Sequence, residues 1–203
     1  MKGKKWFILT AAMLLLGSGA AYASTPWGEF RGFTKIKVQL NGNELATGEV
    51  PGFVIANHAV VPLRAVAGSL QALVDWDDPA KTANIYKPNV HMFIAKEIGK
   101  DDVKTPFGKV KMGDTLDFVV FAQVDSLTTP IHSFRVDIVD PSGIVVQSSD
   151  PVLLEEQKES FWYQWPAKRV TFDAYGRYKV RFLMKLDGLD DYTVVSEKTI
   201  TSG

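Results

Sequence analysis

The sequence predicts a mainly β protein in which a small α+β segment precedes an antiparallel β-sandwich. Residues 116–124 carry an apolar side chain at every second position, with Asp117 and Gln123 on the other face, and comparable short runs return between turn residues as far as residue 195. This near-regular spacing is typical of a sandwich. Earlier in the chain, strand-like runs instead flank a short stretch with helical spacing, at residues 63–70, which predicts a separate α+β segment.

The composition excludes several classes of protein. The 203 residues include no cysteine, so disulfide scaffolds, thiol nucleophiles, cysteine-ligated zinc sites and iron–sulfur clusters are excluded. With 46% hydrophobic residues and 23 basic against 23 acidic side chains, the chain is too apolar and too weakly charged to be disordered. The length fits one or two domains.

Residues 1–23 are predicted to be a secretory signal peptide. Three lysines precede an apolar run over residues 6–16, and Ala21-Tyr22-Ala23 supplies the small residues of a cleavage site. The alternative is a buried or spanning helix, but a span needs about 20 apolar residues. We therefore expect cleavage after Ala23, and no membrane span in the remaining chain.

Removal of the three lysines leaves 20 basic against 23 acidic residues. A nucleic-acid partner is not expected from this balance, since phosphate binding needs a concentrated basic face. Export without cysteine fits a secreted or cell-wall-associated protein of a Gram-positive bacterium.

The predicted segments before the sandwich are a linker over residues 24–34 and an α+β domain over residues 35–97. Asn41-Gly42 is a strong signal for a tight turn. Pro62 lies where a helix can begin, because its missing N–H is not needed there. Strands are predicted around this helix at residues 36–40, 53–55, 59–61, 73–76 and 83–85, with residues 90–94 completing the sheet.

Three blocks of this segment carry a resemblance. They are Val38-x-Leu40-Asn41-Gly42, Val60-Val61-Pro62-Leu63-Arg64-Ala65-Val66-Ala67 and Leu70-x-Ala72-x-Val74-x-Trp76-Asp77. Residues 36–94 thereby resemble the stalk domain first named as the N-terminal domain of some copper amine oxidases. The resemblance implies an accessory α+β module on a secreted bacterial protein, and no activity. Gln71 departs from the family, which usually has glycine there, and this puts the geometry of the turn in question.

Two side chains of this segment have simple structural interpretations. Trp76 is expected to anchor the core of the small domain, and Arg64 to pair with Asp75 or Asp77. The chain lacks the catalytic domain of an amine oxidase, the histidine set for copper and the tyrosine motif that yields the quinone cofactor.

The charged, glycine-containing stretch at residues 98–104 predicts a domain boundary, and the sandwich is expected over residues 104–203. Residues 173–180 resemble the tyrosine-corner region of immunoglobulin-like domains, with Tyr178 as the corner residue. Val180 takes the place of the second cysteine of such domains. The tryptophan expected on the third strand is absent, and Phe134 is its nearest substitute.

No catalytic residue, metal site or cofactor is predicted, so the protein is not expected to be an enzyme. The three histidines, His58, His91 and His132, lack the spacing of metal ligands. The carboxylates of residues 187–191 could offer oxygens to calcium, but they lack the spacing of an EF-hand, and a solvated hairpin is favoured. No serine lies in G-x-S-x-G, and there is no phosphate loop.

The unusual feature is the aromatic run Phe161-Trp162-Tyr163-Gln164-Trp165-Pro166. In a strand, Phe161, Tyr163 and Trp165 share one face, whereas Trp162 and Gln164 share the other. If the first set fills the core, Trp162 and Gln164 are candidate ligand-binding residues on the outer face. The alternative is that a loop or the stalk-like domain covers Trp162.

The sequence therefore predicts a non-catalytic exported protein with a structural or binding role at the cell surface or envelope. Its partner would be a cell-surface protein or a glycan. One alternative is a binding module for cell-wall carbohydrate that uses Trp162. Another is a secreted protease inhibitor, which would need a rigid exposed loop such as Leu153–Glu159.

Overall fold

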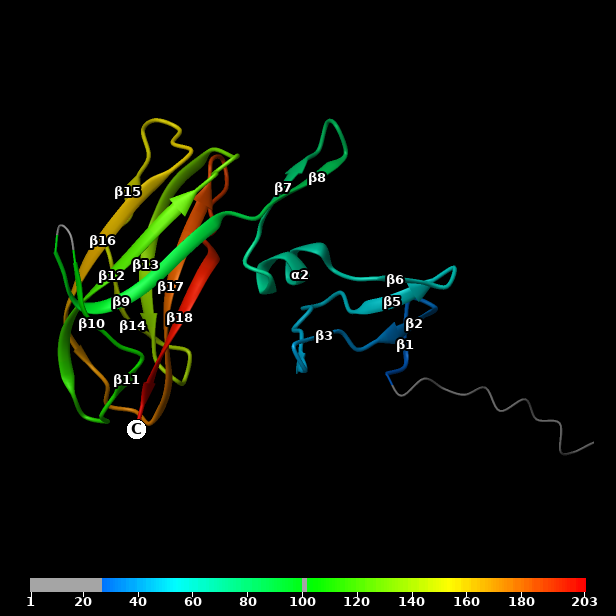
Figure 1. Cartoon of the computed structure of the whole chain (residues 1–203). Coiled ribbons are helices and arrows are strands. Elements are labelled where there is room, and N and C mark those ends of the chain that lie inside the picture. Colours follow the sequence, from blue (N-terminus) through cyan, green and yellow to red (C-terminus); the bar gives the residue numbers. More distant parts are fainter. Residues whose placement is uncertain (1–26, 100–101) are drawn as a thin grey trace, which may run out of the picture. The chain divides into compact units, whose positions relative to one another are not determined.

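The computed structural model describes residues 27–99 and 102–203 (Figure 1). The chain divides into two compact units, residues 1–61 and residues 62–203. The predicted signal peptide and its cleavage site after Ala23 lie outside the described residues. Within the described part, no helix is long and apolar enough to cross a membrane.

The first unit is built from short antiparallel strands. They are β1 (Glu29–Phe30), β2 (Phe33–Ile36), β3 (Gln39–Leu40), β4 (Asn43–Glu44), β5 (Gly52–Ile55) and β6 (His58–Val60). A sheet has the order β1-β2-β5-β6, and β3 pairs with β4. The β1–β2 hairpin corrects the prediction of a linker at residues 29–34. The β3–β4 turn confirms the Asn-Gly signal, since Asn41 and Gly42 have φ values of 51° and 80°.

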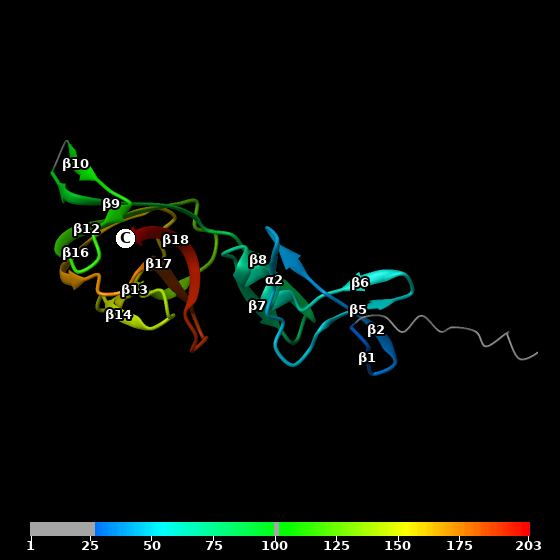
Figure 2. The ribbon, with the colours of Figure 1, turned by 90° about the horizontal axis from the view of Figure 1, so that it is seen from below.

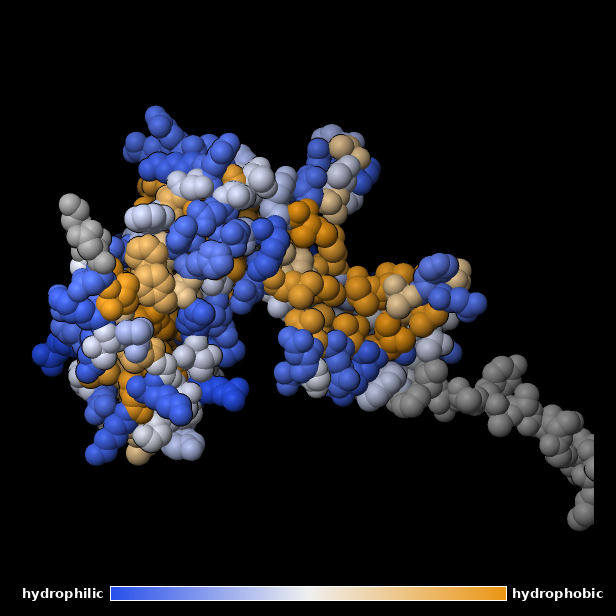
Figure 3. Space-filling view, viewed as in Figure 1, coloured by the Kyte–Doolittle hydropathy of each residue, from blue (hydrophilic) through white to orange (hydrophobic). Residues whose placement is uncertain are grey.

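Aromatic packing, rather than a buried core, characterises this first unit. The Phe53 ring lies 5.5 Å from that of Phe33 and 6.1 Å from that of Phe30. No hydrophobic side chain of residues 27–61 is buried. Figure 3 shows hydrophobic residues gathered over β5 and β6.

The predicted helix is α2 (Leu63–Ser69), and it begins directly after Pro62. Two backbone hydrogen bonds close its C-terminus, from Ala72 N–H to Ala67 O (2.8 Å) and from Gln71 N–H to Gly68 O (3.0 Å). This is a Schellman motif, in which the residue after the C-cap takes a left-handed conformation. Gln71 has a φ of 60°. Gln71 therefore has a backbone conformation that favours glycine, the residue that the family usually has here.

The hairpin of β7 (Leu73–Asp77) and β8 (Thr82–Tyr86) follows, and it corrects two predictions. Trp76 is not a core anchor, because it is 47% exposed and its indole donates to Asp78 Oδ1 at 3.1 Å. Arg64 does not pair with Asp75 or Asp77. Its guanidinium donates instead to the carbonyl oxygen of Val74, at 3.0 Å.

The remaining strands form the predicted sandwich, whose two sheets are seen in Figures 1 and 2. The first sheet has the order β10-β9-β12-β16, and the second β11-β18-β17-β13-β14, with β15 also pairing with β13. The strands are β9 (Asn89–Ile98), β10 (Val103–Pro106), β11 (Lys109–Val110), β12 (Thr115–Asp125), β13 (Ile131–Val139), β14 (Val145–Ser148), β15 (Val152–Leu153), β16 (Phe161–Thr171), β17 (Gly176–Leu186) and β18 (Thr193–Ser202).

Strand β9 differs from its prediction as part of the stalk-like sheet. It pairs along its length with β12, and its Met92 and Ile94 side chains belong to the sandwich core. Strand β10 pairs with its far end, across the predicted boundary at residues 98–104. The long apolar partner β12 gives β9 more surface to bury than the short β7–β8 hairpin does. Residues 89–97 therefore belong to the sandwich, and the other predicted domain limits stay predictions.

The sandwich core is rich in aromatic rings. Phe134 stacks on Phe161 (4.9 Å) and on Phe182 (5.2 Å). Because Phe161 belongs to the first sheet and the other two to the second, this stack joins the sheets. Phe134, the nearest substitute for the absent tryptophan, is thus buried in the core, and Val180 is fully buried in the same cluster.

The tyrosine corner is confirmed. The Tyr178 ring is buried, and its hydroxyl accepts the backbone N–H of Ala174 and donates to Asp173 Oδ1, both at 3.0 Å. Burial raises the pKa of this hydroxyl. The phenol is therefore neutral in the folded protein at physiological pH and able to donate.

We predict that Tyr178→Phe lowers the free energy of unfolding by about 1 kcal/mol or more, because Ala174 and Asp173 lose a partner in a desolvated corner. Urea unfolding measures the loss. Wild-type stability should also fall as pH rises above about 10, where the unfolded tyrosine ionises first. That contribution should be absent from the variant, and an unchanged alkaline profile would contradict a buried phenol.

We predict that Gln71→Gly raises the free energy of unfolding by about 0.5–1 kcal/mol, because it removes the cost of a side chain in the left-handed region. The matched control is Ser69→Gly in the last turn of α2, which should destabilise by about 0.5–1 kcal/mol. Denaturant midpoints compare the two variants. Destabilisation by both would show that Gln71 is not in a left-handed conformation.

Candidate functional site

The candidate site is the outer face of the β10-β9-β12-β16 sheet. In β12, Phe118, Val120, Ala122 and Val124 belong to the core, so the alternate side chains point outward. Strand pairing sets two rows across the sheet. Gln123 lies between His91 and Trp162, and Phe121 lies between Phe93 and Gln164.

Three aromatic rings, Phe93, Phe121 and Trp162, form a strip across strands β9, β12 and β16. Ring centroids are 4.6 Å apart for Phe93 and Phe121, with planes at 25°, and 6.0 Å apart for Phe121 and Trp162. Trp162 is 72% exposed, whereas Phe121 is 9% exposed. The buried Phe121 ring therefore packs against part of the Trp162 indole. Most of the Trp162 surface remains exposed to solvent.

Polar side chains border this aromatic strip. Gln123 Nε2 donates to Asp125 Oδ2 at 3.0 Å, which holds an amide and a carboxylate beside the Trp162 position. Gln164 and His91 are exposed, and their side chains make no hydrogen bond to other described residues. The face thus combines the exposed Trp162 ring with the hydrogen-bonding groups of Gln164 and His91.

A further carboxylate lies towards the other end of the same face. Asp117 accepts the backbone N–H of Arg169 at 2.8 Å and a hydrogen bond from Lys168 at 3.3 Å. The bond from the Arg169 backbone is the main cause that lowers the pKa of Asp117. Asp117 is therefore ionised at neutral pH and paired with Lys168.

The structure places Trp162 and Gln164 on the outer face, as their parity in the strand indicated. Phe161, Tyr163 and Trp165 pack against the core, and the described residues of the sandwich leave Trp162 72% exposed. Sequence reasoning missed Phe93 and Phe121. A signal was available for Phe121, since it shares the parity of Asp117 and Gln123 in an alternating strand.

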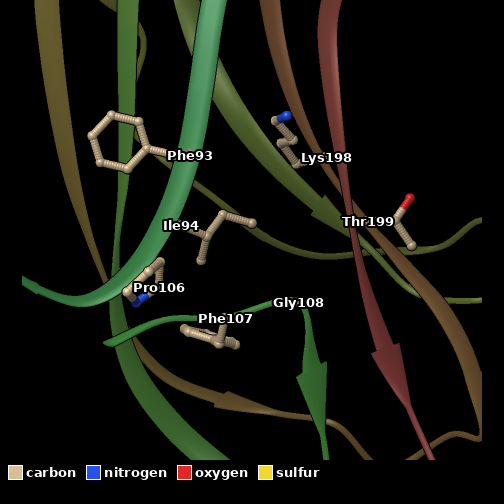
Figure 4. A pocket seen from close by; sticks show the side chains of 7 residues that line it. All are labelled: Phe93, Ile94, Pro106, Phe107, Gly108, Lys198 and Thr199. Atoms are coloured by element: carbon tan, nitrogen blue, oxygen red, sulfur yellow. The ribbon is translucent and has the colours of Figure 1, made fainter. Parts of the chain in front are cut away.

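A shallow cavity of about 410 Å³ lies beside this face, where the chain crosses from one sheet to the other (Figure 4). Its lining comes from β9, from the 106–108 crossover and from β18, and Lys198 is its one charged side chain. In Figure 4 the Phe93 ring lies on the opposite side of β9 from Ile94. The cavity therefore brings no pair of titratable groups together.

Other candidate residues remain dispersed. His58, His91 and His132 lie on β6, β9 and β13. Among residues 27–99 and 102–203, no group of three or more histidine or acidic side chains could hold a metal ion. The carboxylates of residues 187–191 fall in the turn between β17 and β18, without such a grouping.

The loop proposed for protease inhibition is anchored at its middle. Gln157 Nε2 donates to the carbonyl oxygens of Thr129 (3.1 Å) and Leu127 (3.4 Å). Leu127 N–H in turn donates to Glu159 O at 2.8 Å. Leu153, at the start of the loop, is 61% exposed. The loop is thus both tethered and accessible.

Comparison with known proteins finds similarity to a protein family and to solved structures. The family model described as the copper amine oxidase N-terminal domain matches residues 39–114. No curated protein matches the chain. One of the similar solved structures is the CARDB domain of a Pyrococcus furiosus protein in complex with di-metal ions. It is 14% identical, with a TM-score of 0.32, over 64% of this chain and 99% of that chain.

The family match confirms the predicted resemblance, which rested on three sequence blocks between Val38 and Asp77. It concerns an N-terminal domain of the oxidases and covers less than half of this chain. The immunoglobulin-like architecture of the rest is established by its own strand pairing and tyrosine corner. Residues 39–114 are thus similar to the copper amine oxidase N-terminal domain, and the β-sandwich begins at β9, within the matched range.

Proposed function

We propose that this protein is a non-catalytic binding protein of the bacterial cell exterior, and that the outer face with the aromatic strip binds carbohydrate. The observation that carries the proposal is the exposed Trp162 indole, supported by Phe121 and bordered by amide side chains. A single exposed aromatic is ordinary on a surface, and it is the grouping of Trp162 with Phe121 and Phe93 that marks this face as a candidate binding site.

The chemistry of the face suits a sugar ring. A pyranose presents an apolar C–H face that can lie on the Trp162 indole, while its hydroxyls point sideways. Gln164, Gln123 and His91 then stand where they can exchange hydrogen bonds with those hydroxyls. A protein partner would be expected to need a larger continuous apolar patch than one indole.

The expected affinity for a single sugar is low. Covering about 150 Å² of aromatic surface contributes about 4 kcal/mol at about 25 cal/mol per Å². This is comparable with the lower estimates of what association costs in lost freedom. Binding is therefore expected in the millimolar range for a monosaccharide and more tightly on a polymer, where many sites lie close together.

A second candidate, protease inhibition, is favoured by one observation. The Leu153–Glu159 loop is tethered by Gln157 while Leu153 remains exposed, and preorganised loops lose little entropy on binding. An inhibition assay against a panel of secreted proteases would decide. Inhibition that Gln157→Ala weakens and Trp162→Ala leaves intact would favour this candidate over carbohydrate binding.

We predict that Trp162→Ala changes the free energy of unfolding by less than about 0.5 kcal/mol, because the side chain is mostly exposed. The same variant should lose retention on insoluble cell-wall glycan. Thermal melts and pull-down on the polymer measure the two effects. Gln164→Ala should weaken retention less, since one hydrogen bond with the ligand is lost.

Tyr175→Ala is the matched control, because Tyr175 is 78% exposed and lies outside this face, before β17. It should leave both stability and retention unchanged. A loss of about 3 kcal/mol in Trp162→Ala would mean that the indole belongs to the core. Equal retention of wild type and Trp162→Ala would remove the carbohydrate proposal.

A further inference from the structure

The outer face of the second sheet has a different chemistry, and it is set by strand β17. Tyr178, Val180, Phe182, Met184 and Leu186 alternate into the core. The side chains between them therefore point outward. Those outward positions hold Arg177, Lys179, Arg181, Leu183 and Lys185.

Neighbouring strands add one more cation and only two carboxylates to this face. Arg135 lies opposite Leu183 on β13. Glu197 is shared by Arg181 (3.0 Å) and Lys179 (3.2 Å), and Asp137 pairs with Arg135 at 3.1 Å. The face, which we call the cationic row, thus carries five cations and two carboxylates, whereas the whole sequence is neutral.

Two cations of the row have no ion-pair partner among the described residues. They are Arg177 and Lys185, one towards each end of β17. Asp173 and Asp187 lie beyond them, in the turns that bound the strand. Between those turns the row carries a formal charge of +3, from five cations and two carboxylates, because Glu197 is shared by two of the cations.

The cationic row is linear. Alternate residues of a strand are about 6.7 Å apart, so Arg177, Lys179 and Arg181 form an evenly spaced line. Exposed Thr201 and Thr199 lie opposite Arg177 and Lys179 on β18 and offer hydroxyl groups beside the cations. An elongated ligand with repeated negative charges matches this line and these hydroxyls.

We propose that the cationic row binds a linear anionic polysaccharide, in which carboxylate or sulfate groups repeat along the chain. Single-stranded nucleic acid fits less well, because it needs aromatic rings on which bases stack. The aromatic ring at this face is Tyr192, and the Arg135 guanidinium lies over it at 4.5 Å. An anionic membrane surface is the competing occupant, and vesicle binding in the test below separates it from a polysaccharide.

This inference is independent of the carbohydrate site around Trp162, because it rests on charge and on the opposite sheet. Binding to the cationic row should depend strongly on salt, whereas stacking on Trp162 should not. The two proposals can therefore fail separately.

The test is binding of the exported protein to alginate, a linear uronate polymer, with neutral dextran of similar length as the reference. Alginate should bind at about 50 mM salt and be released by about 500 mM, whereas any retention on dextran through Trp162 should not change with salt. The double variant Arg177→Gln/Lys185→Gln should weaken alginate binding by about tenfold. Both residues lack ion-pair partners among the described residues, so the fold should persist in thermal melts.

Lys111→Gln/Lys158→Gln is the matched control, because it removes the same charge from turns outside the row. It should bind alginate like the wild type. Equal weakening by the control would show a non-specific charge effect and would overturn the cationic row. Equally tight, Arg177-dependent binding of single-stranded DNA or of phosphatidylglycerol vesicles would overturn the assignment to a polysaccharide.

Discussion

The two-residue period of the long strands is the constraint on which the rest of the sandwich depends. In β12 and β17, and in β16 as far as Ala167, every second side chain packs on the core, and a shift of one residue would send the charges of β17 inward. The hydrogen bond between Ala174 N–H and the Tyr178 hydroxyl fixes where β17 begins. Once that start is fixed, the chemistry of the outer face of the second sheet follows from the sequence.

The core that enforces this register has no covalent link. Immunoglobulin-like domains often join their sheets by a disulfide next to a tryptophan, and here the Phe161–Phe134–Phe182 stack joins them. Such a stack contributes through buried area and ring geometry. It works without an oxidising environment, which suits a chain that has no cysteine.

Parity within a strand could be predicted from the sequence, and long-range pairing could not. The corner role of Tyr178, the helix start at Pro62 and the outward position of Trp162 all follow from local patterns. Strand β9 was misassigned because its apolar residues fit any sheet, and only the presence of β12 decides which one. Trp76 was misassigned because its hairpin is too small to cover an indole. The aromatic strip was seen only in part, since Phe93 and Phe121 meet through pairing between strands.

The two outer faces can differ in chemistry because substitution of their side chains leaves the packing of the core unchanged. Side chains that face solvent contribute little to stability, so substitution there changes binding with little effect on folding. A strand such as β17 can therefore hold several cations without weakening the sandwich, as long as Tyr178, Val180 and Phe182 keep their places. The cost of concentrating positive charge is limited by Glu197, which lies between Lys179 and Arg181. A carboxylate shared in this way reduces the repulsion between Lys179 and Arg181 and leaves the cationic row net positive. Binding of an anionic chain requires that net positive charge.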